Sequence, residues 1–265
     1  MGRTRKKAKH HRTSLEKDTV VKPTEEHTHT VILLHGAYYD ADEFAGLDAL
    51  VAKEAERRSL SRVRGIKYIF PNSPVDEDGN NFWYEYLAED DAPDMQADND
   101  EINLQQWSTQ VERITGIVRR EVEELGDAKR VLLGGNSQGG TVAIHVALNY
   151  PEPLGALICL RTIAMRLTLG PAPVRHLEGV PDGSFLRDAN TPMLIFVYQA
   201  EKDDTFVLEL QTRNFGLIRS RGFNVSFKVK PNGTHEEEDP NENPQAATWI
   251  VQTFFDTGMA APEHE

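Results

Sequence analysis

The stretch RVLLGGNSQGGTVAIHVALN, residues 130–149, decides the fold of this 265-residue chain. A short apolar run precedes a Gly-x-Ser-x-Gly pattern, formed by Gly135, Ser137 and Gly139, and an apolar segment of helical composition follows it. A serine at a sharp turn between a strand and a helix is held in a strained backbone conformation, so only small residues fit two positions to either side. Because such a turn exposes the hydroxyl, the pattern predicts a nucleophilic serine.

A flexible glycine-rich loop or a phosphate-binding loop is the alternative interpretation of this stretch. It lacks the Lys-Ser/Thr ending of a P-loop and the Gly-x-Gly-x-x-Gly order of a dinucleotide-binding turn. Its place between an apolar strand and a helix favours the catalytic interpretation.

Apolar strands alternate with amphipathic helices along the rest of the chain. Such alternation is typical of an α/β fold, with a mostly parallel central sheet and helices on both faces. Reactive groups then lie beyond the carboxyl ends of the strands, where Ser137, Asp203 and His235 all fall. We expect strands at 31–34, 65–70, 130–133, 155–160, 193–198 and 223–229, and helices at 42–57, 104–125, after 137, 205–219 and from Asn243.

A serine hydroxyl is a weak nucleophile at neutral pH and needs a general base within hydrogen-bond reach. In α/β-hydrolases the nucleophile, an orienting acid and the base form a triad, and they occur along the chain in the order serine, acid, histidine. His235 follows the last strand and satisfies this order, whereas His264 lies in the terminal tail. His145, on the helix after the serine, cannot face back, and His176 precedes the acid.

Two neighbouring aspartates are candidates for the acid. Asp203 is preferred because it comes shortly after the strand that ends at Tyr198, and Asp204 stays open as the alternative. We expect one of them to cap the helix near Thr205 while the other orients His235. A carboxylate in that position holds the imidazole in the correct tautomer and stabilises the imidazolium.

Main-chain N–H groups are expected to form the oxyanion hole. The donors are the N–H of Gln138, directly after the nucleophile, and that of Ala37, in the loop after the strand at 31–34. His35, beside that loop, is interpreted as a structural hydrogen-bonding residue.

The chain resembles the phospholipase/carboxylesterase family of α/β-hydrolases, which includes the acyl-protein thioesterases. The family's Gly-Phe-Ser-Gln-Gly-Gly is close to the sequence at 135–140. The resemblance implies a triad of Ser137, Asp203 and His235, cleavage of carboxylic esters and thioesters, and no metal or organic cofactor. The matching pieces, over most of residues 29–257, are 34–36, 70–74, 83–85, 133–140, Asp203 and 233–236.

Four positions depart from the family pattern, so we expect a divergent member. Tyr38 stands where the family has a glycine, Asn136 stands where it has a large apolar residue, and residues 199–200 are Gln-Ala where it has His-Gly. We expect Tyr38, which narrows the acyl site, and Trp83 to contact the substrate.

Composition and charge restrict the class of protein further. Apolar residues make up 39% of the chain, and the one cysteine, Cys159, cannot form an intrachain disulfide. No apolar run approaches the roughly 20 residues that span a bilayer. The net charge is −13, although residues 1–22 hold eight lysines and arginines against Glu16 and Asp18. This basic opening resembles a nuclear-localisation or nucleic-acid patch, but the acidic remainder argues against nucleic acid as the main ligand.

We expect one α/β-hydrolase domain at residues 27–258, a disordered basic tail at 1–26 and a short tail at 259–265. No apolar segment follows the basic residues, so we expect a cytoplasmic and not a secreted protein, with nuclear location as the alternative. His27 and His29 are interpreted as the entry of a strand, and no metal site is expected.

Two long loops are expected to shape the mouth of the pocket. Residues 76–101 hold eleven acidic residues, and residues 161–190 are rich in arginine, proline and leucine. The acidic run is interpreted as a solvated surface.

The sequence predicts a serine carboxylesterase or thioesterase that forms an acyl-enzyme with a small ester, a lysophospholipid or an acylated protein. Two alternatives stay open: a peptidase or carbon–carbon hydrolase on the same fold, and a non-catalytic binding protein that retains the pocket. One triad opens both oxyesters and thioesters, so the sequence does not separate them, and it leaves the oligomeric state open.

Overall fold

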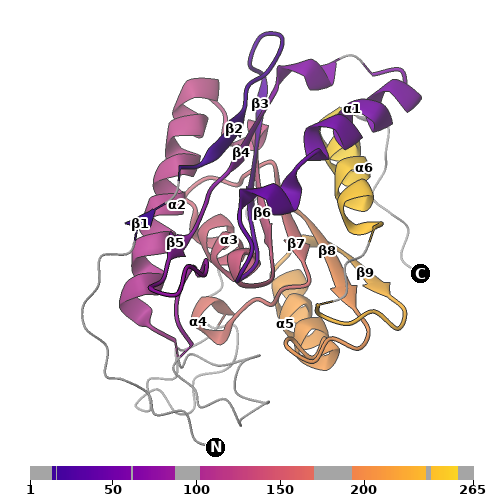
Figure 1. Cartoon of the computed structure of the whole chain (residues 1–265). Helices are drawn as coiled ribbons and strands as arrows, with labels where there is room; N and C mark the ends of the chain where they lie inside the picture. The colour runs from indigo at the N-terminus through magenta and orange to yellow at the C-terminus, as the bar shows by residue number, and fades with distance from the viewer. Residues whose placement is uncertain are drawn as a thin grey trace, which may run out of the picture.

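A seven-stranded sheet forms the centre of the computed structural model, which describes residues 14–15, 17–60, 62–86, 102–169, 193–236 and 240–255. The strand order is β2-β4-β3-β6-β7-β8-β9, and every neighbouring pair is parallel except β2 with β4. The predicted fold class, a mostly parallel sheet with helices on both faces, is confirmed (Figure 1). The strands are β2 (Thr19–Val21), β3 (His29–Leu34), β4 (Ile66–Phe70), β6 (Val131–Asn136), β7 (Ala156–Leu160), β8 (Leu194–Ala200) and β9 (Asn224–Lys230), and β1 (Ser14–Leu15) pairs separately with β5 (Pro74–Val75).

Side chains of the central strands alternate between two apolar cores. In β3, Val31 and Leu33 pack into one core, and Ile32 and Leu34 pack into the other. Because successive side chains of a strand point to opposite faces, a strand covered on both faces has a continuous apolar sequence. This explains the unbroken apolar run at 31–34.

Helices cover both faces of the sheet. α2, α3 and α5 pack on one face, and α1 and α6 lie side by side on the other (Figure 1). None of the helices in the described part of the chain has both the length and the apolarity to cross a bilayer. The helices are α1 (Leu47–Arg57), α2 (Leu104–Leu125), α3 (Ser137–Asn149), α4 (Arg166–Leu169), α5 (Leu208–Ser220) and α6 (Glu242–Phe255), with 3-10 turns η1 (Ala41–Phe44), η2 (Arg62–Gly65) and η3 (Ala128–Arg130).

α2 has the bounds that the sequence predicts. The side chain of Asn103 caps its first turn by accepting a hydrogen bond from the N–H of Gln106 at 3.2 Å. Gly126 ends it in the left-handed conformation, with φ of 69°. Both end signals are characteristic of helices, since they satisfy main-chain groups without an intrahelical partner.

Three other helices begin at places that differ from the prediction. The segment predicted as one helix over 42–57 is split by Gly46, which has φ of 81°. α5 begins three residues after the start of the predicted range 205–219, because a turn built on Asp203 comes first. α6 begins at Glu242, one residue before the predicted asparagine cap.

The sheet begins before the predicted domain boundary at residue 27. β2 pairs with β4, so the prediction of a disordered tail over 1–26 is wrong for residues 17–26. Asp18, next to β2, accepts hydrogen bonds from the side chain of Arg113 and the main-chain N–H of Asn72, so its charge is paired within the fold.

Several predicted features lie outside the described residues. They are the tail segments 1–13 and 259–265, the loop segments 87–101 and 170–192, and the alternative bases His176 and His264.

Candidate active site

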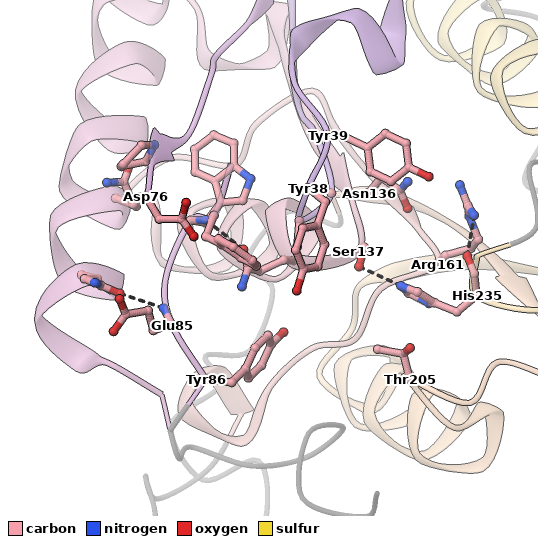
Figure 2. Close-up of a pocket in the computed structure, with 18 of the residues that line it drawn as sticks. Tyr38, Tyr39, Asp76, Glu85, Tyr86, Asn136, Ser137, Arg161, Thr205 and His235 are labelled. Carbon is pink, nitrogen blue, oxygen red and sulfur yellow. Dashed lines mark hydrogen bonds between the residues drawn. The ribbon is translucent and has the colours of Figure 1, made fainter. Parts of the chain in front are cut away.

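The carboxyl ends of neighbouring strands meet around Ser137. Ser137 follows β6, Asp203 follows β8, and His235 follows β9. Because parallel strands present their carboxyl ends at one edge of a sheet, residues far apart in the sequence gather there. Figure 2 shows the side chains of Ser137 and His235 pointing toward each other.

The turn at Ser137 is tight and strained. Ser137 has a left-handed φ of 45°. A Cβ atom on Gly135 would lie 2.7 Å from the carbonyl oxygen of Leu34, and one on Gly139 would lie 2.3 Å from that of His35. Both glycines of the pattern are therefore required by close approach to β3 and the residue after it. The predicted strand–turn–helix is confirmed.

Ser137, His235 and Asp203 form a continuous hydrogen-bonded chain. The Oγ of Ser137 lies 2.8 Å from Nε2 of His235, and Nδ1 of His235 lies 2.8 Å from Oδ2 of Asp203. The ring of Phe206 packs against that of His235 with the centroids 5.3 Å apart. With the Nδ1 proton donated to the carboxylate, Nε2 is free to accept the serine proton.

Asp203 makes two sets of contacts, one to the turn that precedes α5 and one to His235. Its Oδ1 accepts hydrogen bonds from the N–H groups of Thr205 at 3.0 Å and Phe206 at 2.6 Å, while Oδ2 faces His235. The side chain of Asp203 is fully buried, and Asp204 is exposed. The expected division, with one aspartate capping the helix and the other orienting His235, is not found, because Asp203 contacts both the turn and His235 while α5 begins after Val207 without a side-chain cap.

Arg161, which the sequence analysis did not identify, supports the loop that bears His235. Its Nη1 donates to the main-chain carbonyl of His235 at 2.6 Å (Figure 2). Its Nε and Nη2 donate to the two carboxylate oxygens of Glu242, at 2.9 and 2.7 Å. Both side chains are largely buried, and Arg161 has a left-handed φ of 42° directly after β7. This ion pair fixes the backbone beside the candidate base.

Ala37 and Gln138 line the same cavity as Ser137, and their main-chain N–H groups are the predicted oxyanion donors. Among the described residues, neither the N–H of Ala37 nor that of Gln138 has a protein acceptor. Gln138 lies in the first turn of α3, where N–H groups lack an intrahelical acceptor. The next N–H after Ala37, that of Tyr38, donates to the carbonyl of Asn81 at 2.8 Å. Both predicted donors are thus available.

The side chain of Gln138 anchors the segment that carries Trp83. Its Oε1 accepts from the N–H of Trp83, and its Nε2 donates to the carbonyl of Tyr84, both at 2.8 Å. The indole N–H of Trp83 donates to the carbonyl of His35 at 2.8 Å. Trp83 borders the cavity, but only 1% of its surface is exposed to solvent. Contacts within the protein therefore cover most of its side chain.

Tyr38 lines the mouth of the cavity. It is 71% exposed, has a left-handed φ of 68°, and packs edge-on against Phe82 with the ring centroids 4.6 Å apart. The departure from a glycine at this position therefore places an aromatic ring beside the nucleophile (Figure 2).

Two other histidines are packed within the fold. His35 donates from Nδ1 to the carbonyl of Gly36 and accepts at Nε2 from the N–H of Ser73, and burial lowers its pKa to about 4. Its predicted structural role is confirmed. His145 bonds to Thr168 at 3.0 Å, and burial lowers its pKa to about 4 as well. Both imidazoles are held neutral away from the hydroxyl.

A cavity of about 940 Å³ opens over Ser137. Among the described residues that line it, the cationic side chain is Arg161, whose charge is matched by Glu242. In the described part of the chain, the aliphatic residues that line it are Ala37 and Pro74. The remaining described side chains are aromatic, imidazole, amide, hydroxyl or carboxylate: Tyr38, Tyr39, Asp76, Phe82, Trp83, Glu85, Tyr86, Gln105, Gln106, Thr109, Gln110, Asn136, Ser137, Gln138, Thr205, His235 and Glu236.

One cluster of potential metal ligands lies at the opposite edge of the sheet. His27, Glu121 and Glu124 come together before the amino end of β3. The ammonium group of Lys67 already contacts Glu121 at 2.8 Å and Glu124 at 3.1 Å, so a cation occupies this carboxylate pair. The cluster lies before the amino end of β3, whereas Ser137 follows the carboxyl end of β6.

Sequence relatives of the chain include acyl-protein thioesterases and a lysophospholipase-like protein. A sequence profile of the phospholipase/carboxylesterase family matches residues 15–169. Acyl-protein thioesterase 1 from Neurospora crassa is 26% identical over 216 residues, which span 79% of this chain and 80% of that protein. Lysophospholipase-like protein 1 from Mus musculus is 22% identical over 247 residues, which span 88% of this chain and 90% of that protein.

Solved structures share the same fold. The carboxylesterase of Bacillus cereus superposes with a TM-score of 0.63 at 16% identity, covering 90% of this chain and 94% of that chain. Arabidopsis thaliana SOBER1 superposes with a TM-score of 0.62 at 16% identity, covering 85% of this chain and 99% of that chain. These similarities show an α/β-hydrolase fold. Since the family profile covers more than half of the sequence, the chain belongs to the phospholipase/carboxylesterase family of hydrolases.

Proposed function

We propose that the chain hydrolyses carboxylic esters or thioesters through an acyl-enzyme on Ser137. The observation that carries the proposal is the unbroken chain from Ser137 through His235 to Asp203, with 2.8 Å at each step. A nucleophile, a base and an orienting carboxylate in hydrogen-bond contact are the parts that nucleophilic acyl transfer needs.

Acylation begins with transfer of the Ser137 proton to Nε2 of His235 as Oγ bonds to the acyl carbon. The carbonyl oxygen becomes an oxyanion, which the N–H groups of Ala37 and Gln138 stabilise. Asp203 stabilises the imidazolium that forms. The tetrahedral intermediate collapses, the bond to the alcohol or thiol breaks, and the leaving group takes the proton from Nε2.

Deacylation uses the same groups with water as the nucleophile. His235 takes a proton from water, the resulting hydroxide adds to the acyl carbon, and the second tetrahedral intermediate expels Oγ of Ser137. Oγ regains its proton from Nε2, and the carboxylic acid departs. No step requires a group outside these residues and water.

The described lining of the cavity supports compact or polar acyl groups. It contains no leucine, isoleucine, valine or methionine, so among these residues a long hydrocarbon chain finds little aliphatic surface. Each methylene buried against apolar surface contributes about 0.8 kcal/mol, and aromatic and amide side chains suit short or polar groups better. We therefore propose short-chain esters and thioesters, ahead of long-chain acyl proteins, as the preferred substrates.

The direct test is hydrolysis of p-nitrophenyl esters from acetate to palmitate and of the matching thioesters. We expect turnover that falls with chain length and is abolished in Ser137→Ala. Ser220→Ala, at the far end of α5, is the matched control and keeps full activity. Cleavage of amides or diketones with poor ester turnover would favour the alternative hydrolase classes. Ligand binding without turnover would favour a binding protein.

A further inference from the structure

Glu43 lies behind the candidate oxyanion hole and touches both of its sides. Its Oε2 accepts a hydrogen bond from the main-chain N–H of Gly36 at 2.7 Å. Its Oε1 accepts one from Nδ2 of Asn136. Gly36 directly precedes Ala37, and Asn136 directly precedes Ser137. One carboxylate thus joins the loop after β3 to the turn that bears the nucleophile.

The carboxyl group of Glu43 is enclosed, although the residue as a whole keeps some exposure. Burial raises its pKa to about 7, against the opposite effect of its hydrogen bonds to Asn136 and Gly36. The neighbouring charges are Glu242, which raises this pKa, and Arg161, which lowers it. Removing a carboxyl group from water costs free energy unless hydrogen bonds compensate for the lost hydration. The two hydrogen bonds that the Glu43 carboxyl accepts come from Gly36 and Asn136, beside the candidate site.

Asn136 is the partner of Glu43 on the turn that bears the nucleophile. It is buried, and it stands where the family has a large apolar residue. A buried amide needs hydrogen-bond partners, and Glu43 supplies the partner for Nδ2. The Oδ1 atom of Asn136 has no partner among the described residues. The departure at Asn136 therefore provides a polar contact with Glu43 directly before the nucleophile in the sequence.

The loop that carries Ala37 is held on both sides. Gly36 on one side donates to Glu43, and Tyr38 on the other side donates to the carbonyl of Asn81. The N–H of Ala37, between them, stays without a protein acceptor in the described part of the chain. Fixing the two flanking amides determines where this N–H points.

We propose that Glu43 is a positioning residue that locks the oxyanion loop against the nucleophile turn. This inference rests on the proposed function, because it assigns Ala37 and Gln138 as oxyanion donors. Glu43 touches no reacting atom, so its effect appears in transition-state stabilisation and not in substrate affinity. A displacement of about 1 Å in such a site can lower the rate on the order of 100-fold.

Two substitutions of Glu43 separate this role from a general effect on folding. Glu43→Ala removes both contacts. Glu43→Gln keeps them, because the amide oxygen accepts from Gly36 while the amide nitrogen can donate to Oδ1 of a rotated Asn136. Glu56→Ala, on the exposed face of the neighbouring helix α1, is the matched control.

The experiment measures kcat and KM on p-nitrophenyl acetate, with inhibition by a trifluoromethyl ketone that forms the tetrahedral adduct. For Glu43→Ala we expect kcat to fall about 10- to 100-fold with KM within about twofold, and inhibition to weaken by a similar factor. Glu43→Gln should stay within about threefold of the unchanged protein, and Glu56→Ala should match it.

The inference is overturned if folded Glu43→Ala keeps kcat within twofold, or if Glu43→Gln loses as much as Glu43→Ala. Should Glu43→Ala fail to fold, Asn136→Ala removes the contact at the nucleophile turn alone and must lower kcat without raising KM. The proposed function fails separately, when the unchanged protein shows no turnover and Ser137 does not react with a fluorophosphonate.

Discussion

The guanidinium of Arg161 is bonded at once to the main-chain carbonyl of His235, at 2.6 Å, and to both carboxylate oxygens of Glu242. His235 is thereby held at two points, with Asp203 on its ring and Arg161 on its backbone. The position of the candidate base depends on an ion pair that does not itself touch the nucleophile.

Replacing Arg161 by methionine should reduce both stability and kcat. The largely buried carboxylate of Glu242 loses its counter-charge, and removing one partner of a buried pair typically costs about 3–5 kcal/mol. The carbonyl of His235 loses its donor, so the imidazole shifts relative to Ser137. Urea denaturation and kcat on p-nitrophenyl acetate measure the two effects.

The double variant Arg161→Met with Glu242→Met separates those effects. The charges of both partners of the ion pair are then absent, so stability should return toward that of the unchanged protein, while kcat stays low because the carbonyl of His235 has lost this donor. Recovery of kcat together with stability would show that Arg161 acts through folding alone.

Asparagine substitutions at Asp203 and Asp204 form a matched pair. Asp203→Asn should lower kcat on the order of 10³- to 10⁴-fold, because an amide cannot hold the imidazole in the required tautomer. Asp204→Asn should have little effect, since Asp204 is exposed. Steady-state kinetics on one ester suffices, and an equal loss in both variants contradicts the assignment.

The pH dependence of stability should report on Glu43. Its folded-state pKa, about 7, lies above its ordinary value of 4.5. The folded state therefore binds more protons between these values, and the stability this contributes is lost as the pH rises through 7. The free energy of unfolding of the unchanged protein, measured relative to that of Glu43→Gln, should fall by roughly 2–3 kcal/mol between pH 5 and pH 8. Urea denaturation of both proteins at the two pH values measures this change. If the difference in free energy of unfolding between the two proteins is the same at both pH values, the prediction is wrong.

Tyr38 should limit the length of the acyl chain. Tyr38→Gly removes the exposed ring at the cavity mouth and suits the left-handed φ of 68°. We expect the ratio of kcat/KM for octanoate over acetate to rise about tenfold, equivalent to about two more buried methylene groups. A general loss of activity lowers kcat/KM for both esters alike and leaves their ratio the same. An unchanged ratio therefore means that Tyr38 does not limit the length of the acyl site.

The sequence predicted those elements whose local signals agree with their tertiary packing. The apolar runs of β3, β6 and β7 are buried on both faces, and the residues that end α2 are visible as a cap and a glycine. β2 was missed, because its three residues lie in a charged segment and its pairing with β4 is a tertiary contact.

The order of Ser137, Asp203 and His235 was likewise visible, because each lies in the loop that follows a predicted strand. The groups around them were not. Glu43 and Asn136 lie 93 residues apart, and Arg161 and Glu242 lie 81 apart. No short-range pattern links such pairs, since they meet only when the carboxyl edge of the sheet assembles. The double role of Asp203 also depends on the path of the chain after β8, which local propensity does not specify.

The most direct test of the central claim is the site and extent of labelling by a fluorophosphonate, followed by intact mass and peptide mapping. We predict one adduct per chain, located on Ser137, absent in Ser137→Ala and formed much more slowly in Asp203→Asn. A protein that stays unlabelled, or that is labelled at another residue, would contradict a Ser137 nucleophile activated by His235.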